Sequence, residues 1–298
     1  MIPHTEYPNA RTVAFAPTAL IDMVLVGCGG TGSYLARSLV QIALVLGERG
    51  QDVRLTFVDP DTVESRNVPR QSFAPAEIGQ PKAVALATRF SMAWGLPIRA
   101  IASEFAPGTS VGDRHGSLRV LVGCVDNAAG RKAIAKAIAI DASAERQAWW
   151  LDCGNTAEAG QVLFGSADTK ERLAGAFRAP GLCLALPSPA LVAPDLLVAR
   201  PEEKSRRRLS CAELVAANLQ SLTINQRVAA EAADVLARFL VTGSLNRFAT
   251  YFDAASGTAQ SYYATPRDVS RATGVSESLL SGEVGSERRS RRRRTRAA

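Results

Sequence analysis

Charged side chains that could act on the phosphate chain of a nucleotide lie between residues 59 and 126. Arg70 and Lys82 carry positive charge, and a departing pyrophosphate needs such groups because negative charge develops on it. Asp126 could hold a Mg²⁺ ion that bridges the phosphates, although an aspartate at this position could also cap the next helix. The alternative for Arg70 and Lys82 is that they are solvated surface cations. Hydride transfer has little use for extra cations near the phosphates, so the set favours cleavage of a phosphate chain.

A glycine-rich turn upstream predicts where those phosphates would bind. The stretch VLVGCGGTGSYLARSLV, residues 24–40, joins an apolar run to a helical pattern. Its glycines allow a tight turn and close approach of the backbone to an anion, and the N-terminus of the helix supplies unpaired N–H groups. The candidate phosphate-binding residues are Gly27, Gly29, Gly30 and Gly32. A purely structural turn is the alternative, and the turn alone does not separate ATP from NAD or a flavin nucleotide.

Further polar residues complete the candidate nucleotide site. Asp59 ends the second predicted strand, where an acidic side chain can accept hydrogen bonds from ribose hydroxyls. The remaining candidates for ATP binding are Asp61, Asn67, Gln71 and Asn127. Asn127 has a second interpretation, since asparagine is a good N-cap for the helix that would follow.

Strands and helices alternate along the first half of the chain and would bring these residues together. Apolar runs predict strands at 23–27, 54–59, 97–103 and 118–126, and helical periodicity predicts helices at 31–46, 81–94 and 128–142. AWWLDCGN and GQVLFG predict two more short strands. This order is typical of an α/β, Rossmann-like, doubly wound and largely parallel sheet with helices on both faces.

The second half of the chain has a different character. Five prolines and the charged stretch RPEEKSRRR predict a long excursion or crossover-like loop at 167–209. A helical region follows at 211–240, with a break expected near Thr223, and FATYFDA with AQSYYATP predicts a closing β-hairpin. We therefore expect one domain over 1–265, with a C-terminal helical and β-hairpin extension, and a disordered basic tail over 266–298.

The composition indicates a globular body with a basic tail. Of 298 residues, 47% are apolar and 21% are charged, and the formal net charge is +7. Seven arginines lie at 288–296, so residues 1–287 hold 35 − 7 = 28 basic residues against 28 acidic ones. A basic nucleic-acid-binding body is thereby excluded. Any attraction for nucleic acid or an anionic protein would come from the tail.

Cysteine usage and the lack of long apolar runs indicate an intracellular protein. The five cysteines include no C-x-x-C pair, which argues against a disulfide framework and a four-cysteine zinc site. The sequence shows no signal-like N-terminus and no apolar run near the roughly 20 residues that span a membrane. We expect a cytoplasmic protein without a membrane partner.

Five ordered motifs resemble one enzyme superfamily. VGCGGTGS, VDPDTVESRNVPRQ, IGQPKA, VGCVDNAAGR and GQVLFG, in this order and spacing, are similar to those of the ThiF/MoeB superfamily of ubiquitin-activating-type adenylating enzymes. The resemblance covers residues 23 to about 165 closely and extends more loosely to about 240. Within the superfamily, the second motif and its surroundings look most like the ThiF-like proteins of PRTRC gene systems.

The resemblance implies ATP-dependent adenylation of a carboxylate with release of pyrophosphate. Asp59 would bind the ribose and Asp126 would hold Mg²⁺. The phosphate-contacting positions of the family correspond to Gly29, Gly30, Gly32, Asn67, Arg70 and Lys82. The carboxylate in that family is usually the C-terminal glycine of a ubiquitin-like or sulfur-carrier protein, and some members act on a tRNA-borne carboxylate. The substrate could instead be a small-molecule carboxylate, or the protein could be a nucleotide-binding scaffold without turnover.

The resemblance also bears on cysteine chemistry. Relatives that pass the activated protein through a thioester or an acyl persulfide have a cysteine in the region of Cys211. Its predicted place at a helix start, close to the arginines at 206–208, would favour the thiolate. An inert buried cysteine is the alternative, and Cys183 is a second candidate nucleophile. A thioester would imply a conjugating-enzyme-like acceptor as a further partner.

The same resemblance leads to predictions about a zinc site and about the oligomeric state. Relatives with a structural zinc use two C-x-x-C pairs, so no zinc is expected here. Family dimers imply a homodimer, in which Arg11 is the one arginine upstream of the glycine turn that could reach the site of the partner. His4 and His115 lie outside every motif and receive no role.

Overall fold

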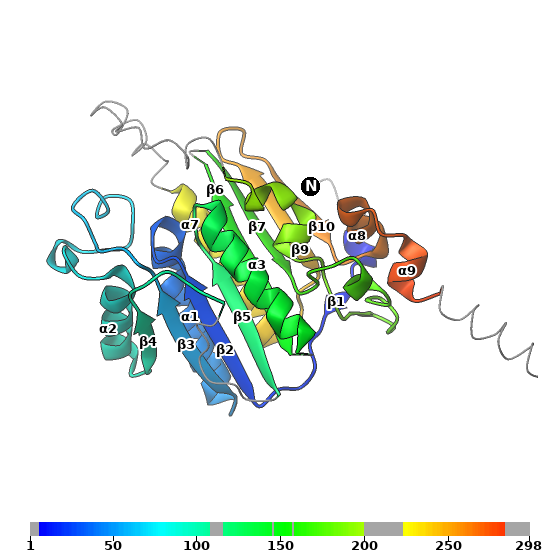
Figure 1. The fold of residues 1–298 in the computed structure, drawn as a ribbon, viewed down its shortest axis with the longest axis horizontal. Helices are drawn as coiled ribbons and strands as arrows, with labels where there is room; N and C mark the ends of the chain where they lie inside the picture. The colour runs from blue at the N-terminus through cyan, green and yellow to red at the C-terminus, as the bar shows by residue number, and fades with distance from the viewer. Residues whose placement is uncertain (1–5, 108–115, 145, 157, 200–222, 284–298) are drawn as a thin grey trace, which may run out of the picture.

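An eight-stranded sheet forms the centre of the computed structural model, which describes residues 6–107, 116–144, 146–156, 158–199 and 223–283. The strand order is β10-β9-β7-β6-β5-β2-β3-β4 (Figure 1). The strands are β2 (Leu20–Val26), β3 (Asp52–Val58), β4 (Ile98–Ile101), β5 (Ser117–Gly123), β6 (Gln147–Asn155), β7 (Ala159–Gly165), β9 (Arg247–Asp253) and β10 (Ala259–Tyr263).

The half of the sheet from β4 to β6 is parallel. Its five strands pair in parallel register and are connected through α1 (Gly30–Glu48), α2 (Lys82–Trp94) and α3 (Ala128–Ser143). Every residue of β2 is buried, as expected for a strand that helices cover on both faces. α1 and α2 lie on one face and α3 lies on the other (Figure 1). The predicted doubly wound α/β fold is therefore confirmed.

The other three strands extend the sheet with antiparallel pairs. β7 pairs with β6, β9 with β7, and β10 with β9. β9 and β10 form the predicted hairpin, and Gly257 in its turn has a left-handed conformation (φ +72°). α7 (Ile224–Ala237) continues into the π turn η5 (Arg238–Thr242) and packs against β6, β7 and α1. The predicted helix at 211–240 is thus observed from residue 224, and its first part lies outside the described residues.

The sheet separates two layers of the hydrophobic core. Trp149 stacks on Phe164, with 5.0 Å between ring centroids, and contacts Phe239 at 4.8 Å. Trp150 belongs to the opposite layer, which it shares with Ile134 of α3. Consecutive strand residues point to opposite faces, so this tryptophan pair fills both sides of the sheet.

The excursion after β7 consists of short elements packed on the body. These are η3 (Glu171–Leu173), β8 (Leu182–Cys183), α4 (Pro189–Val192) and η4 (Pro194–Leu197). Leu173, Phe177 and Leu186 are buried, which holds the segment against the core up to residue 199. β8 pairs in parallel with β1 (Thr12–Val13), which follows η1 (Tyr7–Asn9) near the N-terminus. A further turn, η2 (Pro75–Glu77), precedes α2.

The prediction of a disordered tail from residue 266 is wrong for the first part of that segment. Pro266–Thr273 forms α8 and Glu277–Ser281 forms α9. The side chain of Thr265 caps α8 by accepting a hydrogen bond from Asp268 N at 3.0 Å, and Ser276 caps α9 in the same way from Leu279 N at 3.4 Å. The Ser-, Glu- and Arg-rich composition suggested disorder, but these caps and the buried Leu280 stabilise both helices.

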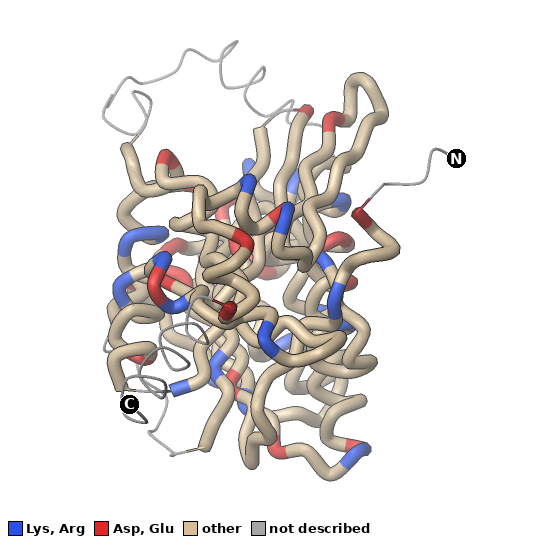
Figure 2. Tube along the Cα trace, turned by 90° about the vertical axis from the view of Figure 1, so that its right-hand side faces the viewer, with Lys and Arg blue, Asp and Glu red and all other residues tan. Residues whose placement is uncertain are grey.

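Charges of both signs alternate along the described chain. Figure 2 shows basic and acidic residues side by side on the tube, in keeping with the balance of 28 basic and 28 acidic residues over 1–287. Within the same described part, no helix combines the length and the apolar character needed to cross a bilayer.

Candidate active site

The glycine turn between β2 and α1 is built so tightly that side chains would not fit at two of its positions. Gly27 has a positive φ of 91°, and a Cβ on it would lie 2.7 Å from the carbonyl oxygen of Cys124. A Cβ on Gly32 would lie 1.9 Å from the carbonyl oxygen of Gly27. The first turn of α1 is therefore pressed against the end of β2. Its N–H groups have no partner inside the helix, so they can bind an anion.

This turn lies at the point where the chain changes direction around the sheet, which is where open α/β folds hold a ligand; we call this place the nucleotide crevice. α1 leaves β2 toward one face, whereas α3 leaves the neighbouring β5 toward the other. Ligands of open α/β sheets bind in such crevices at the carboxyl ends of the strands. The structure brings Asp59 and Asp126 to the same edge, because they follow β3 and β5.

Asp59 ties the glycine turn to the end of β3. Its Oδ2 atom accepts a hydrogen bond from Cys28 N at 2.6 Å, and its Oδ1 atom accepts one from Asp61 N at 2.8 Å. Burial raises the pKa of the Asp59 carboxyl, and these two N–H donors oppose the rise. A carboxylate has roughly four acceptor positions, so Asp59 keeps acceptor capacity for a ribose hydroxyl.

Lys82 lies at the start of α2 and points toward the loop after β3. Its Nζ atom is 2.8 Å from Asp61 Oδ2, and its backbone N–H donates to Asp61 O at 2.9 Å. The Lys82 side chain is 8% exposed and that of Asp61 is 65% exposed. The structure therefore holds Lys82 as a cation at the site, in contrast to the alternative of a solvated surface lysine.

Asn67 organises the loop that carries Arg70 and Gln71. Its Oδ1 atom accepts from Glu64 N at 2.8 Å, and its carbonyl oxygen accepts from Arg70 N at 3.0 Å and Gln71 N at 2.9 Å. Asn67 is buried. Its side chain thus shapes the loop, and direct contact of Asn67 with a phosphate stays a prediction.

Arg70 and Gln71 present unpaired polar atoms to the site. Arg70 Nε and Gln71 Oε1 are buried without a hydrogen-bond partner among the described residues. Burial lowers the pKa of Arg70, as does the charge of Arg66, while Asp126 and Glu64 oppose this change. Gln71 borders the glycine turn, since its Nε2 atom lies 3.9 Å from the position of a Cβ on Gly29. Buried polar groups normally have partners, and these two atoms have none among the described residues.

Helix capping was considered for both Asp126 and Asn127, and the structure assigns it to Asn127. Asn127 is the N-cap of α3, because its Oδ1 atom accepts from Gly130 N at 2.8 Å. Asp126 is exposed and accepts a 3.2 Å hydrogen bond from Asn127 Nδ2. The described residues contain no group of three or more side chains that could hold a metal ion. A single carboxylate fits Mg²⁺ that is held mainly by phosphates and water.

Two interactions at this edge escaped prediction from the sequence. Asn225 of α7 is buried at 2% exposure and bonds to Asn155 at the end of β6, with 2.8 Å between its Oδ1 atom and Asn155 Nδ2. Arg131 and Asp152 form a buried ion pair at 3.1 Å. One feature of the sequence could have indicated the buried Asn225: it lies on the same face of the helix as the apolar residues Val228 and Ala232.

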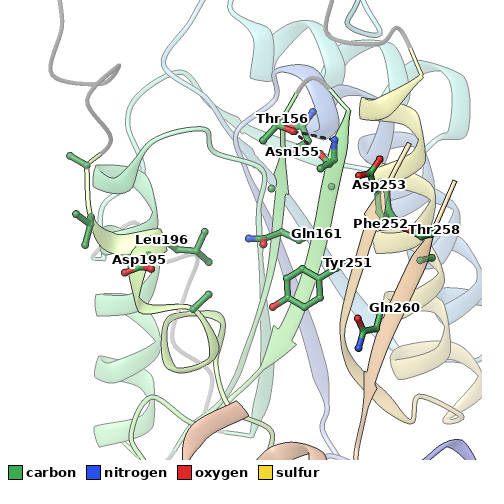
Figure 3. Close-up of a pocket in the computed structure, with 17 residues that line it drawn as sticks. Asn155, Thr156, Gln161, Asp195, Leu196, Tyr251, Phe252, Asp253, Thr258 and Gln260 are labelled. Atoms are coloured by element: carbon green, nitrogen blue, oxygen red, sulfur yellow. Dashed lines mark hydrogen bonds between the residues drawn. The ribbon is translucent and has the colours of Figure 1, made fainter. Parts of the chain in front are cut away.

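A groove of about 950 Å³ opens beside the crevice on the α3 face of the sheet (Figure 3). Gln161, Tyr251 and Gln260 form a polar row across β7, β9 and β10, because the strand register places them opposite one another. Asn155 and Thr156 lie at one end of the groove, and Asn155 also bonds to Asn225 in the nucleotide crevice. The groove and the crevice therefore adjoin.

Cys183 and Arg11 are placed less favourably for the roles considered above. Burial raises the pKa of Cys183 to about 12, which keeps it a thiol and disfavours it as a nucleophile. Cys211 lies outside the described residues. The guanidinium of Arg11 donates to Phe177 O and Ala179 O of its own chain and lies over the Phe177 ring.

Fold and site together define a Rossmann-like α/β protein with a tight glycine turn, a buried lysine and polar loop residues at the carboxyl ends of its parallel strands. The model of the ThiF family matches residues 20–254, which is most of the chain. The protein belongs to the ThiF family.

Comparison with the solved structure of PaaA supports the same fold. PaaA is similar over 82% of this chain and 64% of its own, with a TM-score of 0.51 and 12% identity. Escherichia coli MccB, solved with MccA, is similar over 82% of this chain and 64% of its own, with a TM-score of 0.47 and 13% identity. The chain thus spans less than two thirds of these relatives. No curated protein matches the sequence.

Proposed function

We propose that this protein is an adenylyltransferase that uses ATP to activate a carboxylate. The observation that carries the proposal is the tight glycine turn at the N-terminus of α1, which Gln71 borders at Gly29 and which can bind an anion. Membership of the ThiF family supports the same chemistry.

The proposed reaction joins the carboxylate to AMP. A carboxylate oxygen attacks the α-phosphorus of ATP, the bond from that phosphorus to the bridging oxygen breaks, and pyrophosphate leaves with the electron pair. Arg70 and Lys82 stabilise the charge that develops on the departing group. Asp126 would hold Mg²⁺, which neutralises charge on the phosphates, and Asp59 would accept from the ribose.

The proposed substrate is the C-terminal carboxylate of a ubiquitin-like or sulfur-carrier protein. The groove beside the crevice supports this choice because its polar row of Gln161, Tyr251 and Gln260 can bind the backbone of an extended peptide. Small Gly154 among its lining residues leaves room for such a chain. A small-molecule carboxylate would not need a groove of about 950 Å³, and a tRNA-borne one would bring phosphates toward Asp195 and Asp253 on the groove wall.

Several finer points stay predictions from the sequence. They are the PRTRC subgroup, a homodimeric assembly, a cytoplasmic location, and transfer of the acyl group to Cys211 with a conjugating-enzyme-like acceptor. Mass spectrometry after incubation with ATP and the partner tests the last point, since a thioester adds the mass of the partner to the peptide that contains Cys211.

Exchange of radiolabelled pyrophosphate into ATP tests the proposed function. Small β-grasp proteins ending in glycine are added one at a time, each beside a copy that lacks its last residue. We expect exchange with a full-length partner and none with its truncated copy, because only the former presents the carboxylate at the α-phosphate. If the protein binds ATP but no partner supports exchange, the proposed activity is contradicted.

A further inference from the structure

One buried amide connects three walls of the candidate site. Asn225 Oδ1 accepts from Asn155 Nδ2 at 2.8 Å and from Thr31 Oγ1 at 3.4 Å, and Asn225 Nδ2 donates to Arg70 O at 3.4 Å. Its three partners belong to the end of β6, the first turn of α1 and the arginine loop. Asn225 itself is the second residue of α7 and is 2% exposed.

The same amide also defines the shape of the glycine turn. A Cβ on Gly30 would lie 2.6 Å from Asn225 Oδ1, 2.9 Å from its Cγ atom and 3.0 Å from its Nδ2 atom. The amide plane of Asn225 therefore packs directly on the backbone of Gly30. No other side-chain type of this size offers both a donor and an acceptor in one plane without charge.

We propose that Asn225 is a positioning residue that couples the substrate groove to the glycine turn and the Arg70 loop. It touches the groove through Asn155, the glycine turn through Thr31 and Gly30, and the Arg70 loop through a main-chain carbonyl. Its hydrogen bond to the Arg70 carbonyl fixes the backbone that carries the Arg70 side chain, although Asn225 contacts no reacting atom. This inference rests on the proposed function.

The test uses a variant that removes the hydrogen-bond donor of the Asn225 amide and keeps its acceptor. Asn225→Asp keeps the shape and the acceptor, replaces the N–H group that holds Arg70 O by an oxygen, and adds a negative charge beside the glycine turn. We expect its affinity for a non-hydrolysable ATP analogue, measured by calorimetry, to fall about tenfold, as loss of a buried hydrogen bond allows. Gln226→Ala is the matched control, because Gln226 is the next residue of α7 and is exposed. It should bind the analogue like the wild type.

A double-mutant cycle distinguishes positioning through Arg70 from general support of the fold. In the background of Arg70→Ala, Asn225→Asp should cause a smaller loss of affinity for the analogue than in the wild-type background, because repulsion of the phosphates by the new carboxylate is common to both. Additive losses would overturn the inference, since Asn225 would then act independently of Arg70. Equal affinity of Asn225→Asp and the wild type would overturn it as well. Failure of the wild type to bind the analogue would instead contradict the proposed function.

A second variant keeps the test valid if Asn225→Asp does not fold. Asn155→Ala frees Asn225 Oδ1 from the groove side and leaves α7 unchanged. Hydrogen exchange should then be faster at the N–H groups of residues 30–32 and 70–72 than in the wild type. Unchanged exchange in both segments would contradict the coupling.

Discussion

Arg66 and Arg70 lie on the same loop, and their surroundings give them opposite roles. Arg66 is 56% exposed on its side chain and pairs with Glu64 at 2.6 Å, whereas Arg70 Nε is buried and unpaired. Truncation of Arg70 should lower kcat/KM for pyrophosphate exchange by about 100-fold, because a preorganised charge facing the transition state is lost. Arg66→Ala should stay within about threefold of the wild type, as expected for an exposed pair. Equal losses of kcat/KM in the two variants would contradict a role of Arg70 in the reaction.

The buried Asp152 gives the protein a specific dependence on pH. Burial raises the pKa of this carboxyl from 3.8 to about 6, even though Arg131 opposes the rise. Between these values the folded protein binds more protons than the unfolded chain, so the free energy of unfolding falls as pH rises through this window.

Asp152→Asn should therefore lose this component of the pH dependence. Chemical denaturation at pH 4 and pH 7 measures it, and the variant should gain stability relative to the wild type as pH rises. Other carboxyls titrate in both proteins and cancel in the difference. A difference that is constant with pH would mean that Asp152 titrates normally.

Sequence reasoning located the residues that follow strands and missed those that reach the site from far away. Asp59, Lys82 and Asp126 were predictable because strand ends and helix starts are visible in the apolar pattern. Asn225 reaches the site from a helix that begins long after the motifs, and only the packing of α7 on α1 brings it there. The hydrogen bonds of Asn67 within its own loop were likewise invisible, because nothing in the residue type separates a loop former from a phosphate ligand.

At the scale of elements, two of the glycines in α1 differ in whether a side chain would fit at their position. A Cβ on Gly32 would lie 1.9 Å from Gly27 O, whereas a Cβ on Gly47 meets nothing within 4 Å. Gly32→Ala should lower the free energy of unfolding by roughly 3 kcal/mol or more, because the helix must move away from β2. Gly47→Ala should raise it by up to about 1 kcal/mol, since alanine favours the helix. Thermal unfolding of both variants checks the pair, and a similar effect of the two would contradict this geometry.

Most element boundaries were predictable within a few residues, and the exceptions have physical causes. β2 and β5 are apolar runs with helices on both faces, which leave a plain signal. α8 and α9 were missed because each is short and depends on its cap and on contact with the excursion, where Gly175 N and Phe177 N donate to Leu279 O and Leu280 O. Such short helices derive stability from packing and have little intrinsic preference.

At the scale of the whole molecule, the two C-terminal helices belong to the folded body. A chain of residues 1–265 should unfold roughly 10 °C or more below a chain of residues 1–283, because burial of Val269, Val275 and Leu280 is lost. Calorimetry of the two truncated proteins measures the difference. Equal midpoints would show that the body ends at residue 265.

The N-terminal strand is fastened by parts of the chain that are made much later. Arg11 N donates to Ala264 O, Thr12 N to Gly181 O and Val13 N to Leu245 O. During synthesis β1 leaves the ribosome before all three acceptors, which emerge only after the parallel strands. β1 is therefore among the last of these strands to dock, and the nascent chain must carry it unpaired while the parallel half of the sheet forms.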